Sequence, residues 1–377
     1  MGNVYRQRKS DWMPRRINGW AAVLSLFLGA CRPMDLPPQV GLSSPPIEST
    51  DLLPISTLAP TGTNIPDPTV APTISLSNQR LFPNTDLSNM AITGMAVSPN
   101  GQQIAFITWG LGVKLFDIAE EREGGHWALP EPGADEIRAV AFEPSGQYLA
   151  VGDDVGNVYM LETEYLEAWF NWSYELPIVE LAFTPDGRYL GVATEPREGS
   201  PNVHFWAYPD LYELETTGQA CSIQSGRSDD EFYLSVKTSE VSSVKLLRVG
   251  ENATLVFRSS TSLPCPFSSA QDVLAGVDGG VVHAWAIDED SLVELQGDWA
   301  KTRSADVRAI QALAGPGHQM VVFYSDNSLT WWDVATRTEL LYLSEPVQAA
   351  TFAPDGSLIV ALPNGVIERW TSRIQIP

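Results

Sequence analysis

The sequence predicts an all-β protein whose main domain, residues 78–377, is a seven-bladed β-propeller of four-stranded blades. Three observations predict this fold: a turn motif recurs about every 42 residues, an apolar motif follows each copy at a similar distance, and apolar residues alternate on either side of the turn. A cleaved signal peptide over residues 1–30 and a disordered Pro/Ser/Thr-rich tether over residues 31–77 are predicted to precede the propeller.

The first 30 residues have the pattern of an export signal. Basic residues between Arg6 and Arg16 precede an uncharged stretch that ends in small residues. The apolar core is shorter than the ~20 residues that a membrane-spanning helix needs, so we expect it to be removed. The tetrapeptide from Leu28 to Cys31 (Leu-Gly-Ala-Cys) resembles the lipobox of bacterial lipoproteins. The resemblance implies that Cys31 is lipidated; a plain secreted signal peptide is the alternative.

The next segment is predicted to be a tether. Ten prolines and only five charged residues lie between Arg32 and Ser77, and neither a helical nor a strand period is present. Such a composition buries too little apolar surface to offset the entropy of ordering, and proline favours extended conformations. We therefore expect a semi-rigid spacer that holds the propeller away from a membrane surface.

The turn motif has the form apolar-x-Pro-x-Gly-x-x-Leu/Ile. Residues 183–187 (Phe-Thr-Pro-Asp-Gly) are a clear copy, whereas the fourth and fifth copies are degenerate, which leaves six or eight blades as alternatives. Pro-Asp-Gly is a tight-turn signal between strands, and the period is that of a four-stranded blade. The seven copies begin at Val97, Phe142, Phe183, Ile223, Phe267, Leu313 and Phe352.

A second landmark, apolar-x-x-bulky, follows every copy and is predicted to be the third strand of each blade. The seven segments are Val113–Phe116, Val158–Leu161, Val203–Trp206, Val244–Leu247, Val282–Trp285, Leu329–Trp332 and Ile367–Trp370.

Over residues 86–377 the chain resembles the WD40-repeat proteins. Trp332-Asp333 is the literal Trp-Asp dipeptide, and Phe116-Asp117 is a near match. The Gly-His dipeptide of that family is absent from its expected position, so the resemblance implies a propeller without the family's Asp-His-Ser/Thr-Trp hydrogen-bond network.

The last blade needs an outer strand to complete it. Either Asn78–Phe82 or the C-terminal Arg373–Ile376 would supply one, and closure of the ring removes exposed sheet edges. If the N-terminal segment closes the ring, truncation before Leu81 is expected to be harmless and truncation past it destabilising.

Two cysteines besides Cys31 occupy equivalent places in neighbouring repeats. Cys221 and Cys265 each lie two residues before the start of a turn motif, on predicted inner strands. Exported proteins retain disulfides, so these residues are a possible disulfide; the alternative is two small buried apolar side chains.

The charge excludes several partners. The formal net charge is −23, and removal of residues 1–30 leaves 18 basic and 45 acidic residues, a net charge of −27. Such a surface repels the phosphates of nucleic acids and the headgroups of anionic lipids. The sequence contains no nucleophile elbow, zinc-binding pair, P-loop or dinucleotide fingerprint, so we expect no catalytic residue, no metal site and no cofactor.

Recognition is therefore expected on the loops between the second and third strands, because loops on a rigid scaffold commonly carry function. The predicted function is that of a non-catalytic scaffold for a protein partner, monomeric and lipid-anchored in the bacterial cell envelope, facing the periplasm or the cell exterior. The alternatives are glycan binding through an aromatic platform and an enzyme with its site at the central funnel. The candidate loop residues are Asp153, Asp154, Glu195, Arg197, Glu198, Asp278 and Asp326, and the candidate platform residues are Trp169 and Trp172.

Overall fold

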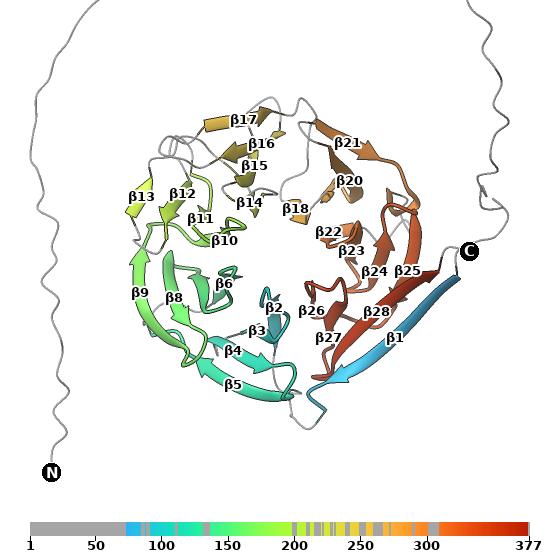
Figure 1. Ribbon diagram of the computed structural model, residues 1–377, viewed down its shortest axis with the longest axis horizontal. Coiled ribbons are helices and arrows are strands. Elements are labelled where there is room, and N and C mark those ends of the chain that lie inside the picture. Colours follow the sequence, from blue (N-terminus) through green and yellow to red (C-terminus); the bar gives the residue numbers. More distant parts are fainter. Residues whose placement is uncertain are drawn as a thin grey trace, which may run out of the picture. The chain divides into compact units, whose positions relative to one another are not determined.

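The computed structural model shows sheets arranged around a central axis (Figure 1). It describes residues 73–83, 87, 91–109, 112–130, 136–197, 202–208, 212–214, 220, 222–226, 229, 231–237, 242–248, 254–258, 267–270, 273–288, 291–300 and 309–375. The predicted signal peptide and Cys31 lie outside these residues, as do Cys221, Cys265 and Glu198.

The described strands form seven four-stranded antiparallel sheets. The first sheet contains β2 (Ile92–Val97), β3 (Gln103–Thr108), β4 (Gly112–Asp117) and β5 (Arg122–Trp127). The second contains β6 (Ile137–Phe142), β7 (Tyr148–Asp153), β8 (Asn157–Glu162) and β9 (Glu167–Ser173). The third contains β10 (Ile178–Phe183), β11 (Tyr189–Thr194), β12 (Val203–Ala207) and β13 (Tyr212–Leu214).

The remaining sheets repeat this order. The fourth contains β14 (Ser222–Ser225), β15 (Glu231–Lys237), β16 (Ser242–Arg248) and β17 (Thr254–Arg258). The fifth contains β18 (Phe267–Ala270), β19 (Val273–Asp278), β20 (Val281–Asp288) and β21 (Ser291–Leu295), followed by the one-turn 3-10 helix η1 (Asp298–Ala300). The sixth contains β22 (Ala309–Gly315), β23 (Gln319–Tyr324), β24 (Leu329–Asp333) and β25 (Thr338–Leu343). The seventh contains β26 (Ala349–Phe352), β27 (Leu358–Ala361), β28 (Ile367–Gln375) and β1 (Thr73–Leu81).

The core consists of apolar clusters between neighbouring sheets. Alternate residues of each strand point to opposite faces of the sheet. Each face packs against a different neighbouring sheet, which explains why the middle strands are almost continuously apolar. One cluster joins Phe106 and Phe116 of the first sheet to Ile359 and Ile367 of the seventh. The prediction of an all-β propeller with four-stranded blades is confirmed, and all seven predicted third-strand segments lie within third strands.

The seventh sheet is completed by the N-terminal strand. β1 pairs with β28 over nine residue pairs, from Thr73 with Gln375 to Leu81 with Ile367. The N-terminal alternative is therefore the one that supplies the outer strand. β1 begins at Thr73, so the strand includes the last five residues that the sequence assigned to the tether, and truncation before Leu81 would remove most of it.

The turn motif is placed correctly in the four copies that contain Pro-x-Gly and is shifted in the copies without it, which begin at Ile223, Phe267 and Leu313. Val97, Phe142, Phe183 and Phe352 each end an inner strand. Ile223 is the second residue of β14, and Ser225 occupies the place of Phe183, because Ser225 pairs with Phe232 as Phe183 pairs with Leu190. Without the turn residues, the sequence offered no mark of where the strand ends.

The part of the chain that the structure describes contains no helix long and apolar enough to cross a membrane.

Candidate functional site

The two ends of the sheets define two faces of the domain. Because consecutive strands are antiparallel, the first-to-second and third-to-fourth turns of each sheet lie on one side, which we call the turn face. The second-to-third turns and the connections between sheets lie on the other side, which we call the loop face. The predicted loop residues that the structure describes are on the loop face: Asp153, Asp154, Glu195, Arg197, Asp278 and Asp326.

A central cavity of about 800 Å³ is lined mainly by the inner strands of the seven sheets, β2, β6, β10, β14, β18, β22 and β26. Its wall is mostly apolar or uncharged. Among the described residues, the charged side chains that line it are Arg138 and Glu180. This cavity is therefore a candidate binding site with little charge to drive catalysis.

Arg138 reaches the cavity through a β-bulge. β2, β6 and β10 each carry one extra residue near their start, and these residues, Thr93, Arg138 and Val179, all line the cavity. A bulge redirects a side chain that regular alternation would place elsewhere. The Arg138 guanidinium donates to Glu195 Oε1 at 2.7 Å and so links the second sheet to the loop after β11.

Glu180 connects the third sheet to the fourth. Its carboxylate accepts hydrogen bonds from the Ile223 amide at 2.7 Å, from the Ser222 hydroxyl at 2.8 Å and from the Gln224 amide group. Burial raises the pKa of Glu180 to about 7, although these three donors favour the ionised form. Glu180 is the only carboxyl among the described residues that line the cavity, so no pair of carboxyl groups is assembled there.

The predicted loop residues mostly stabilise their own turns. The buried Asp153 carboxylate accepts from the amides of Val155 and Asn157 at 3.1 and 2.7 Å, and from the Asn157 side chain at 2.8 Å. Asp326 likewise accepts from the Ser328 amide and hydroxyl at 3.0 and 2.6 Å. These bonds are the ordinary chemistry of tight turns and leave the two carboxylates engaged.

The remaining loop residues are more available. Glu195 pairs with Arg138, and Arg197 lies 3.6 Å from Glu175 in an ion pair that is largely exposed on both sides. Asp278 is exposed at the end of β19. Exposed ion pairs of this kind add little stability.

The two tryptophans of the predicted platform differ in exposure. Trp169 is 41% exposed, whereas Trp172 is half-buried with its ring centroid 4.7 Å from that of Trp206. Trp172 belongs to a row of rings that we call the aromatic strip, which fills the space between the outer parts of the second and third sheets. The strip consists of Tyr148, Trp169, Phe170, Trp172, Trp206 and Tyr208.

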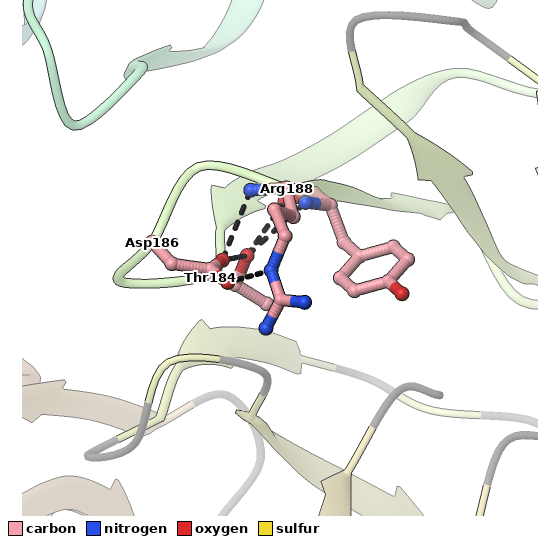
Figure 2. Close-up of polar contacts among 4 residues, drawn as sticks. Thr184, Asp186 and Arg188 are labelled. Atoms are coloured by element: carbon pink, nitrogen blue, oxygen red, sulfur yellow. Dashed lines mark hydrogen bonds and ion pairs between the residues drawn. The ribbon is translucent and has the colours of Figure 1, made fainter. Parts of the chain in front are cut away.

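The turn face carries a polar motif within the Pro-Asp-Gly turn. Figure 2 shows the hydroxyl of Thr184 and the backbone and side chain of Arg188 converging on the Asp186 carboxylate, with bonds of 2.7 Å from Thr184 Oγ1 and 2.9 Å from the Arg188 amide. Burial opposes ionisation, but these hydrogen bonds hold the pKa of Asp186 below its ordinary value. The motif recurs in the seventh sheet, where Asp355 accepts from Ser357 and pairs with Arg369 at 2.6 Å. Because the same arrangement occurs in two sheets, it stabilises the turn and is not specific to one site.

Residues that could bind a metal ion do not gather in the described ranges. No group of three or more His, Cys, Asp or Glu side chains in that part of the chain is placed to hold one. Sequence reasoning missed Arg138 and Glu180. The signal was present, since each is a charged residue inside an otherwise apolar inner strand, but the bulge that aims Arg138 depends on strand pairing and is invisible in the sequence.

The sixth sheet, which contains the Trp-Asp dipeptide, holds a short hydrogen-bond chain. Trp332 Nε1 donates to Thr330 Oγ1 at 3.1 Å, and the Tyr324 hydroxyl lies 3.0 Å from the same oxygen. The Thr330 hydroxyl is thus hydrogen-bonded to both Trp332 and Tyr324 in this sheet.

Comparisons with known proteins agree with this fold. No family model matches the chain. A stretch of 282 residues is 23% identical to the Periodic tryptophan protein 2 homolog of Neurospora crassa; the match covers 71% of this chain and 28% of the length of that protein.

Two solved structures resemble the domain. The Cps50 (Swd1) β-propeller domain of Myceliophteria thermophila has a TM-score of 0.60 and 10% sequence identity, covering 74% of this chain and 95% of that one. The WD40 repeats of RRP9 have a TM-score of 0.57 and 13% identity, covering 76% and 95%. These likenesses show that the chain has the fold of a WD40-repeat β-propeller.

Proposed function

We propose that this protein is a non-catalytic scaffold whose seven sheets form the blades of one ring, and that its loop face binds a protein partner. The observation that carries the proposal is the composition of the central site: a mostly uncharged cavity with Arg138 and Glu195 paired at the loops beside it. WD40 propellers are usually non-catalytic scaffolds, which supports the same function.

We also propose that the chain is held at a bacterial envelope membrane through lipidated Cys31, with residues up to 72 as the tether. This part rests on the sequence alone, on the lipobox resemblance and the proline content. Intact-mass analysis of the mature N-terminus tests it, because an acylated Cys31 supports the anchor and an unmodified chain beginning elsewhere removes it.

Crosslinking of the full chain in membranes, followed by purification and identification of the bound protein, tests the scaffold proposal. A charge reversal at the loop face, Glu195→Lys, is expected to reduce recovery of a stoichiometric partner. Glu120→Lys, on the turn face of the first sheet, is the matched control and is expected to leave recovery unchanged. Equal recovery from both variants would exclude the loop face as the binding surface.

Glycan binding is the second candidate function, and exposed Trp169 is the observation that favours it. The two-ring platform that the sequence suggested requires Trp172 to turn away from Trp206. Titration with cell-wall oligosaccharides, followed by the fluorescence of the wild type and of Trp169→Ala, distinguishes this function from the scaffold.

A further inference from the structure

The outer part of the second sheet exposes two aromatic side chains beside carboxylates. Tyr165 is 65% exposed in the turn before β9, and Trp169 is 41% exposed on β9 itself. Glu164 and Glu167, on either side of Tyr165 in the sequence, are also exposed. We call these four residues the acidic aromatic edge.

The repeat does not require these rings. β9 has a bulge opposite Met160 and Leu161, and Trp169 is the extra residue in it. β5 and β25 have the same bulge, so equivalent positions can be compared directly. Where the structure describes the side chains, the equivalents of Trp169 are Gly124 and Leu340, and those of Tyr165 are Glu120 and Thr336.

The exposure of Trp169 differs from that of its equivalent in the sixth sheet, Leu340. Leu340 is 6% exposed and belongs to the core cluster between the sixth and seventh sheets, so the apolar residue at this position of the sixth sheet is buried. Trp169 is larger than that position needs and stays substantially exposed. A large ring that packs on one side and leaves the other side exposed is a common feature of binding surfaces.

Trp169 is also held in place from behind. Its ring centroid lies 5.8 Å from that of Tyr148 and 5.9 Å from that of Phe170, and Tyr148 in turn lies 5.7 Å from Tyr208. These contacts restrict the indole before any ligand arrives. A preorganised ring loses little conformational entropy on binding, so its exposed face is available for stacking.

The charges beside the rings are all negative. Glu162, Glu164 and Glu167 fall within six residues that contain no basic side chain. Within the described ranges, no Lys, Arg or His forms an ion pair with Glu164 or Glu167. Glu164 accepts a hydrogen bond from the Tyr165 hydroxyl at 2.7 Å. The potential at this edge and the π faces of the rings therefore favour the same ligand, a cation.

We propose that the acidic aromatic edge binds a basic, extended segment of a protein partner, with an arginine or lysine side chain stacked on Trp169 and adjacent cations facing Glu164 and Glu167. This inference rests on the proposed scaffold function and adds a second site, distant in the fold from the loop-face turns. A net charge of −23 favours a basic partner and repels one that carries phosphates. A neutral glycan would stack on the ring and donate hydroxyl hydrogen bonds to the carboxylates, but its affinity would not fall with rising salt as that of a cation does.

The test is a titration of the full chain with a fluorescein-labelled octapeptide of alternating arginine and glycine. The matched probe is the same peptide with citrulline in place of arginine, which keeps the shape and removes the charge. Fluorescence anisotropy at low and high ionic strength gives the affinity and its salt dependence. The wild type is expected to bind the arginine peptide, more tightly at low salt, and to bind the citrulline peptide weakly.

Two variants locate the binding. Trp169→Ala is expected to weaken binding about two- to five-fold through loss of the cation-π contact, and Glu164→Gln with Glu167→Gln to reduce the salt dependence. Two control variants are expected to leave both quantities unchanged. They are Tyr342→Ala, which removes a ring that is 40% exposed on β25, and Glu121→Gln with Glu123→Gln, which removes two charges from the equivalent turn and outer strand of the first sheet.

Several results would overturn the inference. If neither Trp169→Ala nor Tyr342→Ala weakened binding, the peptide would bind by overall charge alone; equal losses from the two variants would show that Trp169 is not the specific contact. Equal affinity for the citrulline peptide would show that recognition does not depend on a positive charge. Binding of a chitooligosaccharide that depends on Trp169 would show that the edge binds glycans. If the partner captured by crosslinking binds Trp169→Ala as it binds the wild type, the scaffold stands and this site fails. If no partner is captured, the scaffold fails and the peptide titration still decides the edge.

Discussion

Replacement of Glu180 by glutamine should stabilise the protein at alkaline pH and leave it unchanged at acidic pH. Burial raises the pKa of Glu180 from an ordinary value of 4.5 to about 7, so between these values the native state binds a proton that the unfolded chain has released. The free energy of unfolding therefore falls as the pH rises from about 4.5 through about 7. The full shift corresponds to about 3 kcal/mol, as an upper bound.

The assay is urea denaturation at pH 5 and pH 8, followed by tryptophan fluorescence. Glu180→Gln mimics the protonated carboxyl, so its unfolding free energy should exceed that of the wild type at pH 8 by up to about 3 kcal/mol and match it at pH 5. Glu175→Gln, at a side chain that is 91% exposed, is the control and should change neither value. An equal loss of stability at both pH values would show that the three hydrogen-bond donors outweigh burial, and would refute the reasoning.

Two further predictions concern stability. Phe82 is 1% exposed and packs against Phe106 and Phe116, with its ring centroid 4.9 Å from that of Phe116. Phe82→Ala should therefore lower the free energy of unfolding, measured by chemical denaturation, by about 3–5 kcal/mol. A loss below about 1 kcal/mol would mean that the segment after β1 does not contribute to the core. Asp153→Ala should cost about 1–3 kcal/mol by leaving the donors of its turn unpaired. Calcium should not raise the melting temperature of the wild type, and a rise that Asp153→Ala abolishes would assign the carboxylate to a cation site.

The regular part of the fold was predictable because two local signals agree. The turn residues around Asp186 and the apolar third-strand segments recur with one period, and both are set by short-range chemistry. Where the turn residues are missing, as at Ile223, the strand was found but its end was misplaced by two residues. The start of β1 at Thr73 was missed because a strand with Ser and Thr at alternate positions resembles a linker until its partner is known.

The candidate sites were less predictable, since they depend on pairing. Arg138 and Trp169 are each the extra residue of a β-bulge, and a bulge is defined by the opposite strand. The exposure of Trp169 and the half-burial of Trp172 follow from the position of the third sheet, which places Trp206 against one ring and not the other. Composition can indicate that aromatic residues matter in such a segment but cannot say which face each ring takes.

The pairing of β1 with β28 has a consequence for biogenesis. Residues 73–81 are among the first of the domain to be synthesised, and their partners in residues 367–375 are the last. The nine residue pairs between β1 and β28 therefore cannot form until translation ends. Until then the nascent domain is an open arc with unsatisfied edges, and contacts of such long sequence separation form slowly. The seventh sheet therefore cannot be completed, nor its outer edge covered, before the last strand of the domain has been made.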